Sequence, residues 1–169
     1  MIRKSCLLAI LLCLGAQVQA APARQFKVNE APSTQDVYPD RITRFPKGVT
    51  GLADVTYQVL PGFRPMAIDL YLPMSKSPKP LILYIHGGGW VAGNTRHSGA
   101  LADFPKVLAS LAAEGFVVAS LEYRLSGEAP FPAALQDSRA ALRFLRANAA
   151  KYGIDPAKIA LWGGSAGGH

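Results

Sequence analysis

The sequence predicts an α/β fold in which a mostly parallel sheet is covered by helices on both faces. A hairpin is followed by strand, helix, strand, helix and strand, the order expected when crossover helices join parallel strands. One of these strands is an unbroken apolar run, so it is expected to be buried on both faces. The last strand leads directly into a glycine-rich turn. No internal repeat or low-complexity tract competes with this interpretation.

The predicted hairpin consists of residues 54–60 and 66–72, joined by the turn-forming pair Pro61-Gly62. Residues 81–86 form the central strand, because Leu, Ile, Leu, Tyr and Ile follow one another there without a polar break. The run at 116–121 is the next strand along the chain.

Two helices alternate with these strands. Apolar residues recur at helical spacing over 101–114, and a glycine follows as the C-terminal stop. A proline suited to a first helical turn opens the second helix, 132–152. The pair Asp155-Pro156 then turns the chain into the last strand, 158–162. The apolar face of the second helix is expected to comprise Leu135, Leu142 and Leu145.

Residues 1–20 have the features of a signal peptide. A basic start is followed by an apolar run, and Val18-Gln19-Ala20 places small residues where signal peptidase cleaves. We therefore expect an exported protein, periplasmic or secreted, whose mature chain begins after this segment. Residues 21–51 are polar and proline-rich without sustained periodicity, so a linker and an irregular N-terminal arm are expected there.

The composition argues against several classes of partner. The formal net charge is +7, but the basic residues are scattered and no aromatic-plus-basic motif occurs, so no nucleic-acid partner is expected. No Cys/His spacing typical of a metal site is present, and we expect neither metal nor cofactor. Both cysteines, Cys6 and Cys13, lie in the signal segment, and no membrane span is expected after it. The oligomeric state stays open.

The segment Gly163-Gly164-Ser165-Ala166-Gly167 matches G-x-S-x-G and lies between a predicted strand and a predicted helix. A serine hydroxyl becomes an effective nucleophile when a base removes its proton, and this tight turn presents it clear of neighbouring side chains. Gly163 and Gly167 are expected because a Cβ there would collide with the adjoining strand or helix. The structural alternative is a serine that only caps a helix. A phosphate-binding loop would need a lysine that is absent here.

A second motif, His86-Gly87-Gly88-Gly89-Trp90, directly follows the central strand. Three consecutive glycines leave backbone N–H groups free to point into a cleft, where they can stabilise the negative charge of a tetrahedral intermediate. A glycine loop without a role would explain neither the flanking histidine and tryptophan nor the position after the strand. The motif therefore predicts an oxyanion hole.

Together the two motifs resemble the α/β-hydrolase superfamily, in particular the hormone-sensitive-lipase-like esterases and the related bacterial feruloyl-esterase and acetyl-esterase types. The similarity extends over roughly residues 55–169. Supporting segments are 68–73, 123–125 and 131–137. Residues 52–169 are accordingly expected to be the N-terminal part of an α/β-hydrolase domain.

The resemblance implies a role for each matched residue. Ser165 would be the nucleophile, and the N–H groups of Gly88, Gly89 and Ala166 would be the oxyanion donors. The motif residues His86, Gly87, Gly163 and Gly167 would be structural, with His86 bracing the glycine loop. Trp90 would line the substrate pocket, and core packing is the alternative for so large an aromatic residue.

The histidines of this chain are not expected to serve as the base. His169 follows Ser165 by four residues, and in the resembled fold that position packs beneath the active site. His97, in a polar stretch before a helix, has a weaker claim. The fold supplies its triad in the order serine, acid, histidine. The acid and the catalytic histidine are therefore expected beyond residue 169.

Asp137 and Arg124 precede the nucleophile and are not expected in the triad. Asp137 is instead expected to form a structural charge set with Arg139 or Arg143 on the long helix. On this interpretation the fold is truncated after its fifth strand, and the apolar edge of that strand is exposed. The 169-residue chain is then expected to be inactive and poorly soluble.

The expected function is hydrolysis of carboxylic esters through an acyl-enzyme at Ser165. The substrate would be a small-molecule or polysaccharide-linked ester, and the residues select no particular acyl or alcohol group. A peptidase or amide hydrolase of the same fold is an alternative, because one triad chemistry serves all three. A non-catalytic binding relative is another.

Overall fold

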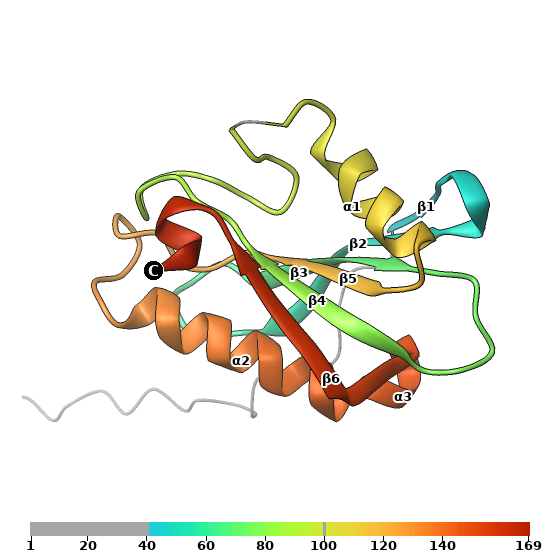
Figure 1. Cartoon of the computed structure of the whole chain (residues 1–169). Coiled ribbons are helices and arrows are strands. Elements are labelled where there is room, and N and C mark those ends of the chain that lie inside the picture. Colours follow the sequence, from blue (N-terminus) through green and yellow to red (C-terminus); the bar gives the residue numbers. More distant parts are fainter. Residues whose placement is uncertain (1–40, 100) are drawn as a thin grey trace, which may run out of the picture. The chain divides into compact units, whose positions relative to one another are not determined.

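The fold is built around one six-stranded mixed sheet, on which the helices pack (Figure 1). The computed structural model describes residues 41–99 and 101–169. The strand order is β1-β2-β3-β5-β4-β6; neighbours are antiparallel from β1 to β5 and parallel among β5, β4 and β6. The strands are β1 (Arg41–Arg44), β2 (Thr50–Gln58), β3 (Met66–Leu72), β4 (Lys79–Ile85), β5 (Val117–Leu121) and β6 (Ile154–Gly163).

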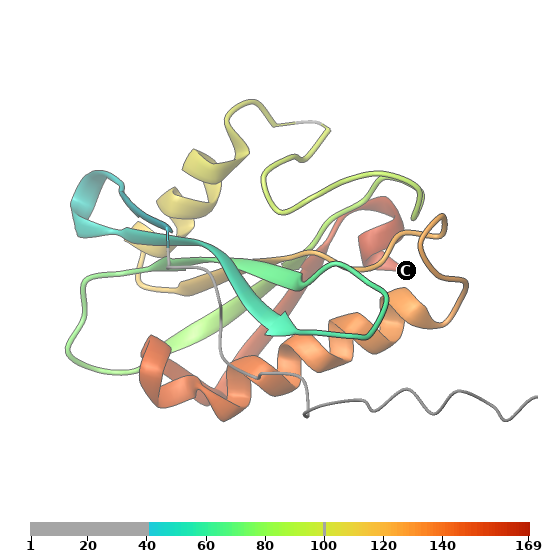
Figure 2. The same ribbon diagram turned by 180° about the vertical axis from the view of Figure 1, so that it is seen from behind.

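Helices cover both faces of this sheet. In Figure 1, α1 lies above the sheet and α2 and α3 lie below it; Figure 2 shows the same layers from behind, with β2 nearest the viewer. Each face of the sheet has its own apolar core. One core includes Phe104 and Leu108 of α1, and the other includes Ala141 and Leu145 of α2. The predicted α/β class is confirmed. The helices are α1 (Phe104–Ala113), α2 (Ala133–Ala147), α3 (Ala149–Tyr152) and the 3-10 turns η1 (Pro46–Gly48) and η2 (Ser165–Gly168).

The central position of β4 is confirmed, since it lies between β5 and β6. Its side chains alternate between the two cores, Leu81 and Leu83 on the α2 side and Tyr84 on the α1 side. All five residues of β5 are buried. Covering both faces of parallel strands requires such apolar runs. Among the described residues, no helix has the length and apolar character needed to cross a membrane.

The predicted hairpin of β2 and β3 is confirmed, but regular structure begins earlier than expected. Residues 41–51 form β1, η1 and the start of β2, where the sequence predicts the end of an irregular arm. All four residues of β1 are exposed, including Ile42. Such a strand has no buried face and therefore no apolar alternation to reveal it. The predicted signal peptide and residues 21–40 of the predicted arm lie outside the described residues.

The predicted helices differ from the observed ones at their ends. The first begins at Phe104, and Leu101 lies outside it, 41% exposed. The second is divided at Asn148, whose backbone and side-chain N–H groups both donate to Phe144 O, at 3.0 and 2.9 Å. The backbone of Asn148 has φ of −104° and ψ of 18°, outside the helical region, and this separates α2 from α3. Leu135 is 45% exposed and so does not belong to the core face of α2.

The last strand also begins earlier than predicted. β6 starts at Ile154, before the predicted turn at Asp155-Pro156. Its pairing with β4 shifts register between Ile154 and Ile159, so the intervening residues bulge out of the ladder. Within this bulge the Asp155 carboxylate accepts a hydrogen bond from Ala157 N at 3.0 Å. The turn chemistry is therefore present, but it interrupts the strand instead of preceding it.

Candidate active site

Ser165 lies at the carboxyl end of β6, on the turn that opens η2. The residue is exposed, and its φ of 52° lies in the left-handed region that residues with a side chain rarely adopt. Across residues 41–99 and 101–169, no group is hydrogen-bonded to its hydroxyl. A strained, exposed serine directly after a strand is the geometry of a nucleophile elbow.

Close backbone packing holds this elbow. A Cβ on Gly163 would lie 2.1 Å from Gly167 O, and a Cβ on Gly167 would lie 2.0 Å from Ile85 O. Both obstacles are backbone atoms, which cannot turn aside as a flexible side chain can. Glycine is therefore required at both positions, and Gly167 packs the elbow onto the end of β4.

The elbow and the triple-glycine loop, residues 87–93, meet at Gly87. A Cβ built on Gly87 would lie 3.3 Å from Ser165 Cβ and 2.7 Å from Gly164 O. The loop begins where β4 ends, and β4 pairs in parallel with β6 up to Ile85 and Gly163. Because parallel strands present their carboxyl ends at the same edge, the sheet brings the two sequence motifs together.

The triple-glycine loop makes a tight turn at Gly88. Its carbonyl accepts hydrogen bonds from Val91 N and Ala92 N, both at 3.1 Å. Gly88 and Gly89 have φ of 111° and 61°, and a Cβ on Gly88 would lie 2.1 Å from Ala92 O. Within the described part of the chain, the N–H groups of these two glycines donate to no acceptor. Ala166, the third residue expected to donate, lies in the first turn of η2.

His86 anchors the first end of the loop. Its ring is 1% exposed and stacks on Tyr123 with the centroids 4.1 Å apart, while its Nδ1 lies 2.7 Å from Gly87 O. The Tyr123 hydroxyl donates to His86 O at 2.9 Å. Burial lowers the pKa of His86 from its ordinary value. A buried, stacked ring suits a bracing role better than proton transfer at the exposed Ser165.

Trp90 faces a cavity of about 1090 Å³ on the α2 side of β4 and β6. Its carbonyl accepts hydrogen bonds from Ser126 N and Oγ, both at 2.8 Å. The indole is 41% exposed, so it is not part of either core. Gly163 and Ala166, which flank Gly164 and Ser165 in the sequence, line the same cavity. The structure thus places Trp90 beside the elbow.

The remaining histidines lie at the surface. His169 is exposed and meets the Trp90 ring edge-on at 5.6 Å, where the sequence predicts a side chain packed beneath the site. His97 is exposed, with Nδ1 3.3 Å from Asn94 Oδ1. Neither imidazole is hydrogen-bonded to Ser165 in the residues described.

The sequence predicted the wrong partner for Asp137 on the long helix. Asp137 is fully buried and pairs with Arg124, not with Arg139 or Arg143. Its carboxylate accepts hydrogen bonds from Arg124 N and Nε at 2.9 Å and from Nη2 at 2.8 Å. A buried carboxylate needs a paired and hydrogen-bonded partner. The guanidinium and backbone N–H that follow β5 together provide one.

The residues that support the triple-glycine loop lie outside both sequence motifs, and the sequence predicted no role for them. Besides Tyr123, these include Asp69, which is 3% exposed and binds Thr95 and Arg96 just after the loop. One signal was present, because Asp69 interrupts the otherwise apolar sequence of β3. An acid in a buried strand has to find a partner.

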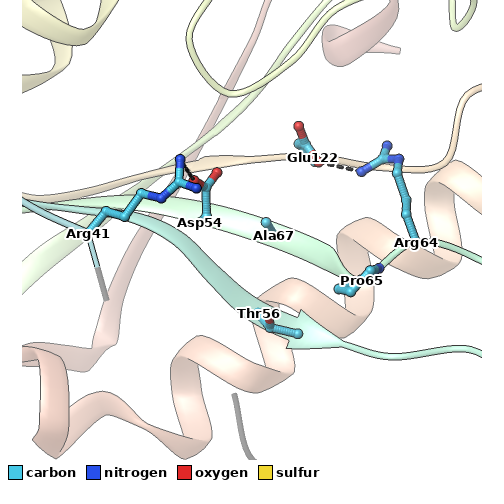
Figure 3. A pocket seen from close by; sticks show the side chains of 7 residues that line it. All are labelled: Arg41, Asp54, Thr56, Arg64, Pro65, Ala67 and Glu122. Carbon is cyan, nitrogen blue, oxygen red and sulfur yellow. Dashed lines mark hydrogen bonds and ion pairs between the residues drawn. The ribbon is translucent and has the colours of Figure 1, made fainter. Parts of the chain in front are cut away.

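A smaller cavity, of about 350 Å³, lies near the opposite edge of the sheet from β6 (Figure 3). Arg41 pairs with Asp54 at 3.4 Å in its wall, and Arg64 pairs with Glu122. The charges of this cavity therefore neutralise one another, and it forms no part of the candidate site.

Comparison with known proteins agrees with this geometry. Residues 68–169 match the BD-FAE family. The chain belongs to the BD-FAE family. Its sequence is 35% identical over 156 residues to carboxylesterase NlhH of Mycobacterium tuberculosis, an alignment that covers 92% of this chain and 43% of NlhH.

Solved esterase structures share the fold of this BD-FAE chain. A truncated form of a carbohydrate esterase from gut microbiota is 38% identical, with a TM-score of 0.57 over 70% of this chain and 40% of that one. A bacterial heroin esterase is 36% identical, with a TM-score of 0.57 over 71% of this chain and 36% of that one. The predicted α/β-hydrolase fold is confirmed. The chain spans less than half the length of these relatives.

Proposed function

We propose that the protein hydrolyses carboxylic esters with Ser165 as the nucleophile. The observation that carries the proposal is the packing of the elbow against the triple-glycine loop at Gly87, next to an exposed serine with a φ of 52°. In the part of the chain that the structure describes, the N–H groups of Gly88 and Gly89 in that loop donate to no acceptor. Relatives named carboxylesterase and carbohydrate esterase support the same reaction class.

In the proposed reaction, Ser165 Oγ attacks the ester carbonyl carbon, and its proton passes to a histidine base. The oxyanion that forms accepts hydrogen bonds from the N–H groups of Gly88, Gly89 and Ala166. Its collapse expels the alcohol, which takes the proton from the imidazolium, and leaves the acyl group on Ser165. Water, deprotonated by the same base, then releases the carboxylic acid and restores the serine.

We expect this histidine and its orienting acid to lie in the part of the whole protein beyond residue 169. In this fold the triad follows the order serine, acid, histidine. His86 is buried under the loop, and His97 and His169 are not bonded to Ser165 in the described residues. The aligned segment makes up 43% of NlhH, so relatives of this length have ample chain for both groups.

The substrate is proposed to be a small-molecule or polysaccharide-linked ester. Both Ser165 and Trp90 are exposed, so the scissile bond can approach while attached to a larger molecule. The similarity to a carbohydrate esterase supports the polysaccharide-linked class. Trp90 is proposed as a wall of the pocket that receives the acyl or alcohol group.

The test uses the whole protein expressed from its complete reading frame. It should hydrolyse p-nitrophenyl acetate, and Ser165→Ala should lower kcat by about a thousandfold or more. Ser110→Ala is the matched control, because that exposed hydroxyl donates to Lys106 O of its own helix, at 2.9 Å. A fluorophosphonate probe should label Ser165 alone.

Two other outcomes would redirect the proposal. Turnover of p-nitroanilides without turnover of esters would identify an amide hydrolase. A folded whole protein that cleaves neither substrate and resists the fluorophosphonate would be a binding relative.

The protein is also proposed to be exported. The basic start, apolar run and small residues up to Ala20 support this, although they lie outside the described residues. N-terminal sequencing of protein recovered outside the cytoplasm should begin at Ala21. Recovery of the whole product in the cytoplasm with Met1 intact would contradict export.

A further inference from the structure

Asp69 of β3 carries a buried carboxylate whose two oxygens each accept two hydrogen bonds. Oδ1 accepts from Asp54 N at 2.8 Å and from Arg96 Nη2 at 3.1 Å. Oδ2 accepts from Thr95 Oγ1 at 2.9 Å and from Arg96 Nε at 2.7 Å. The guanidinium pairing is therefore bidentate, and the carboxylate has the partners that its burial requires.

These contacts fix the far end of the triple-glycine loop to the sheet. Thr95 is 3% exposed, and its carbonyl accepts a hydrogen bond from Ser120 Oγ at 2.7 Å. Ser120 lies on β5 directly opposite Asp69 on β3. We call Asp69, Thr95 and Arg96 the clamp. Just before Thr95, Gly93 packs so closely that a Cβ there would lie 2.2 Å from His86 Nδ1. These contacts therefore hold the far end of the loop where Gly93 packs against His86 at the first end.

The clamp is also electrostatic. Hydrogen bonds to Asp69 raise the pKa of Arg96, so its guanidinium keeps its charge. Arg96 Nη2 extends the pairing to the Asp54 carboxylate at 2.5 Å, which in turn meets Arg41 (Figure 3). A chain of alternating charges thus connects β1, β2 and β3 to the residues that follow the loop.

We propose that Asp69 is a positioning residue for the oxyanion donors. Through Thr95 and Arg96 it holds the triple-glycine loop so that the N–H groups of Gly88 and Gly89 stay aimed at the carbonyl that Ser165 attacks. The inference rests on the function proposed above. Because Asp69 acts through the loop, its loss affects the chemical step more than substrate binding.

Asp69→Asn in the whole protein tests this inference. The amide keeps the shape but removes the charge and turns one acceptor into a donor. We expect kcat to fall by about tenfold, less than for a donor removed outright, with KM nearly unchanged. The affinity for n-butylboronic acid should fall by a similar factor, because its serine adduct places a negative oxygen in the oxyanion hole. Asp155→Asn, at the β6 bulge, is the matched control.

A second pair of variants separates positioning from folding. Thr95→Ser keeps the hydroxyl that donates to Asp69 and should retain a nearly wild-type kcat. Thr95→Val removes that hydroxyl and should lower kcat as Asp69→Asn does. Backbone amide exchange over residues 87–96 should rise in Asp69→Asn and Thr95→Val.

The outcomes distinguish the two proposals. Wild-type kcat, boronate affinity and loop exchange in an active Asp69→Asn variant would overturn the role of Asp69 and leave ester hydrolysis intact. A wild-type protein that hydrolyses no ester and is not labelled at Ser165 would overturn both.

Discussion

The two loops of the candidate site are held in place by different kinds of contact. The elbow that carries Ser165 rests on backbone against backbone, at Gly163 and Gly167. The triple-glycine loop has backbone contacts too, but its two ends also depend on side chains, Tyr123 at one end and Asp69 at the other. A backbone collision cannot be relieved by choosing another rotamer, whereas a side-chain hydrogen bond can be weakened by degrees. The elbow is therefore expected to fail as a unit, and the loop to lose function gradually.

Gly167→Ala should have the largest effect. Its Cβ would lie 2.0 Å from Ile85 O, and relieving this contact requires separating the elbow from β4. We expect a loss of more than about 4 kcal/mol in the free energy of unfolding, measured by denaturant titration. Gly164→Ala is the control, since among the described residues a Cβ built there has nothing within 4 Å beyond its chain neighbours. If both variants unfolded at the same midpoint, the steric account of the elbow would be wrong.

Tyr123→Phe should have an intermediate effect. It removes the hydroxyl that donates to His86 O and leaves that carbonyl unpaired, at a cost of about 1–3 kcal/mol in stability. The loop should loosen as well, so kcat for p-nitrophenyl acetate should fall. Tyr57→Phe is matched, because its hydroxyl donates to Glu122 O at 2.7 Å, away from the site. An equal loss of kcat in both variants would show that Tyr123 acts only through general stability.

The burial of His86 predicts a pH dependence of stability. Burial lowers its pKa in the folded state, so below pH about 6.5 the unfolded chain binds a proton that the folded chain does not. The contribution to stability is present above that pH and is lost as the pH falls. The Tm of the wild type should decline between pH 7 and pH 5, and less steeply in His86→Gln. His97→Gln, at an exposed position, is the control; equal slopes in all three proteins would exclude His86 as the cause.

Ser126→Ala should have the smallest effect. The Trp90 carbonyl loses the Ser126 hydroxyl but keeps the Ser126 backbone N–H at 2.8 Å. Because the site is exposed and the acceptor stays paired, we expect a change of about 0.5 kcal/mol or less in stability. A drop in Tm as large as that of Tyr123→Phe would mean that the Trp90 backbone is held mainly by the hydroxyl.

The elements that sequence alone predicted best are those with two buried faces. Apart from Lys79 and Ser120, the runs that became β4 and β5 are apolar, and no other structure explains them as well. β1 was missed because it is wholly exposed. The long helix is divided at Asn148, where the backbone leaves the helical region and the side chain bonds Phe144 O, a local feature that apolar periodicity does not record.

The two motifs of the candidate site were visible in the sequence because each is contiguous. Their supports were not, since these join residues distant along the chain. Arg124 and Asp137 are 13 residues apart, and Asp69 and Arg96 are 27 apart. Which arginine meets which acid is decided by the packing of β5 against α2, or of β3 against the loop. A buried acid can be suspected from the sequence, but its partner emerges only from the fold.

The most direct test of the account is a crystal structure of the whole protein carrying a phosphonate ester on Ser165. We predict that the phosphoryl oxygen lies about 2.7–3.1 Å from the backbone nitrogen of Ala166 and from that of Gly88 or Gly89. A phosphoryl oxygen turned toward solvent, or beyond hydrogen-bonding distance of every amide in the triple-glycine loop, would contradict it.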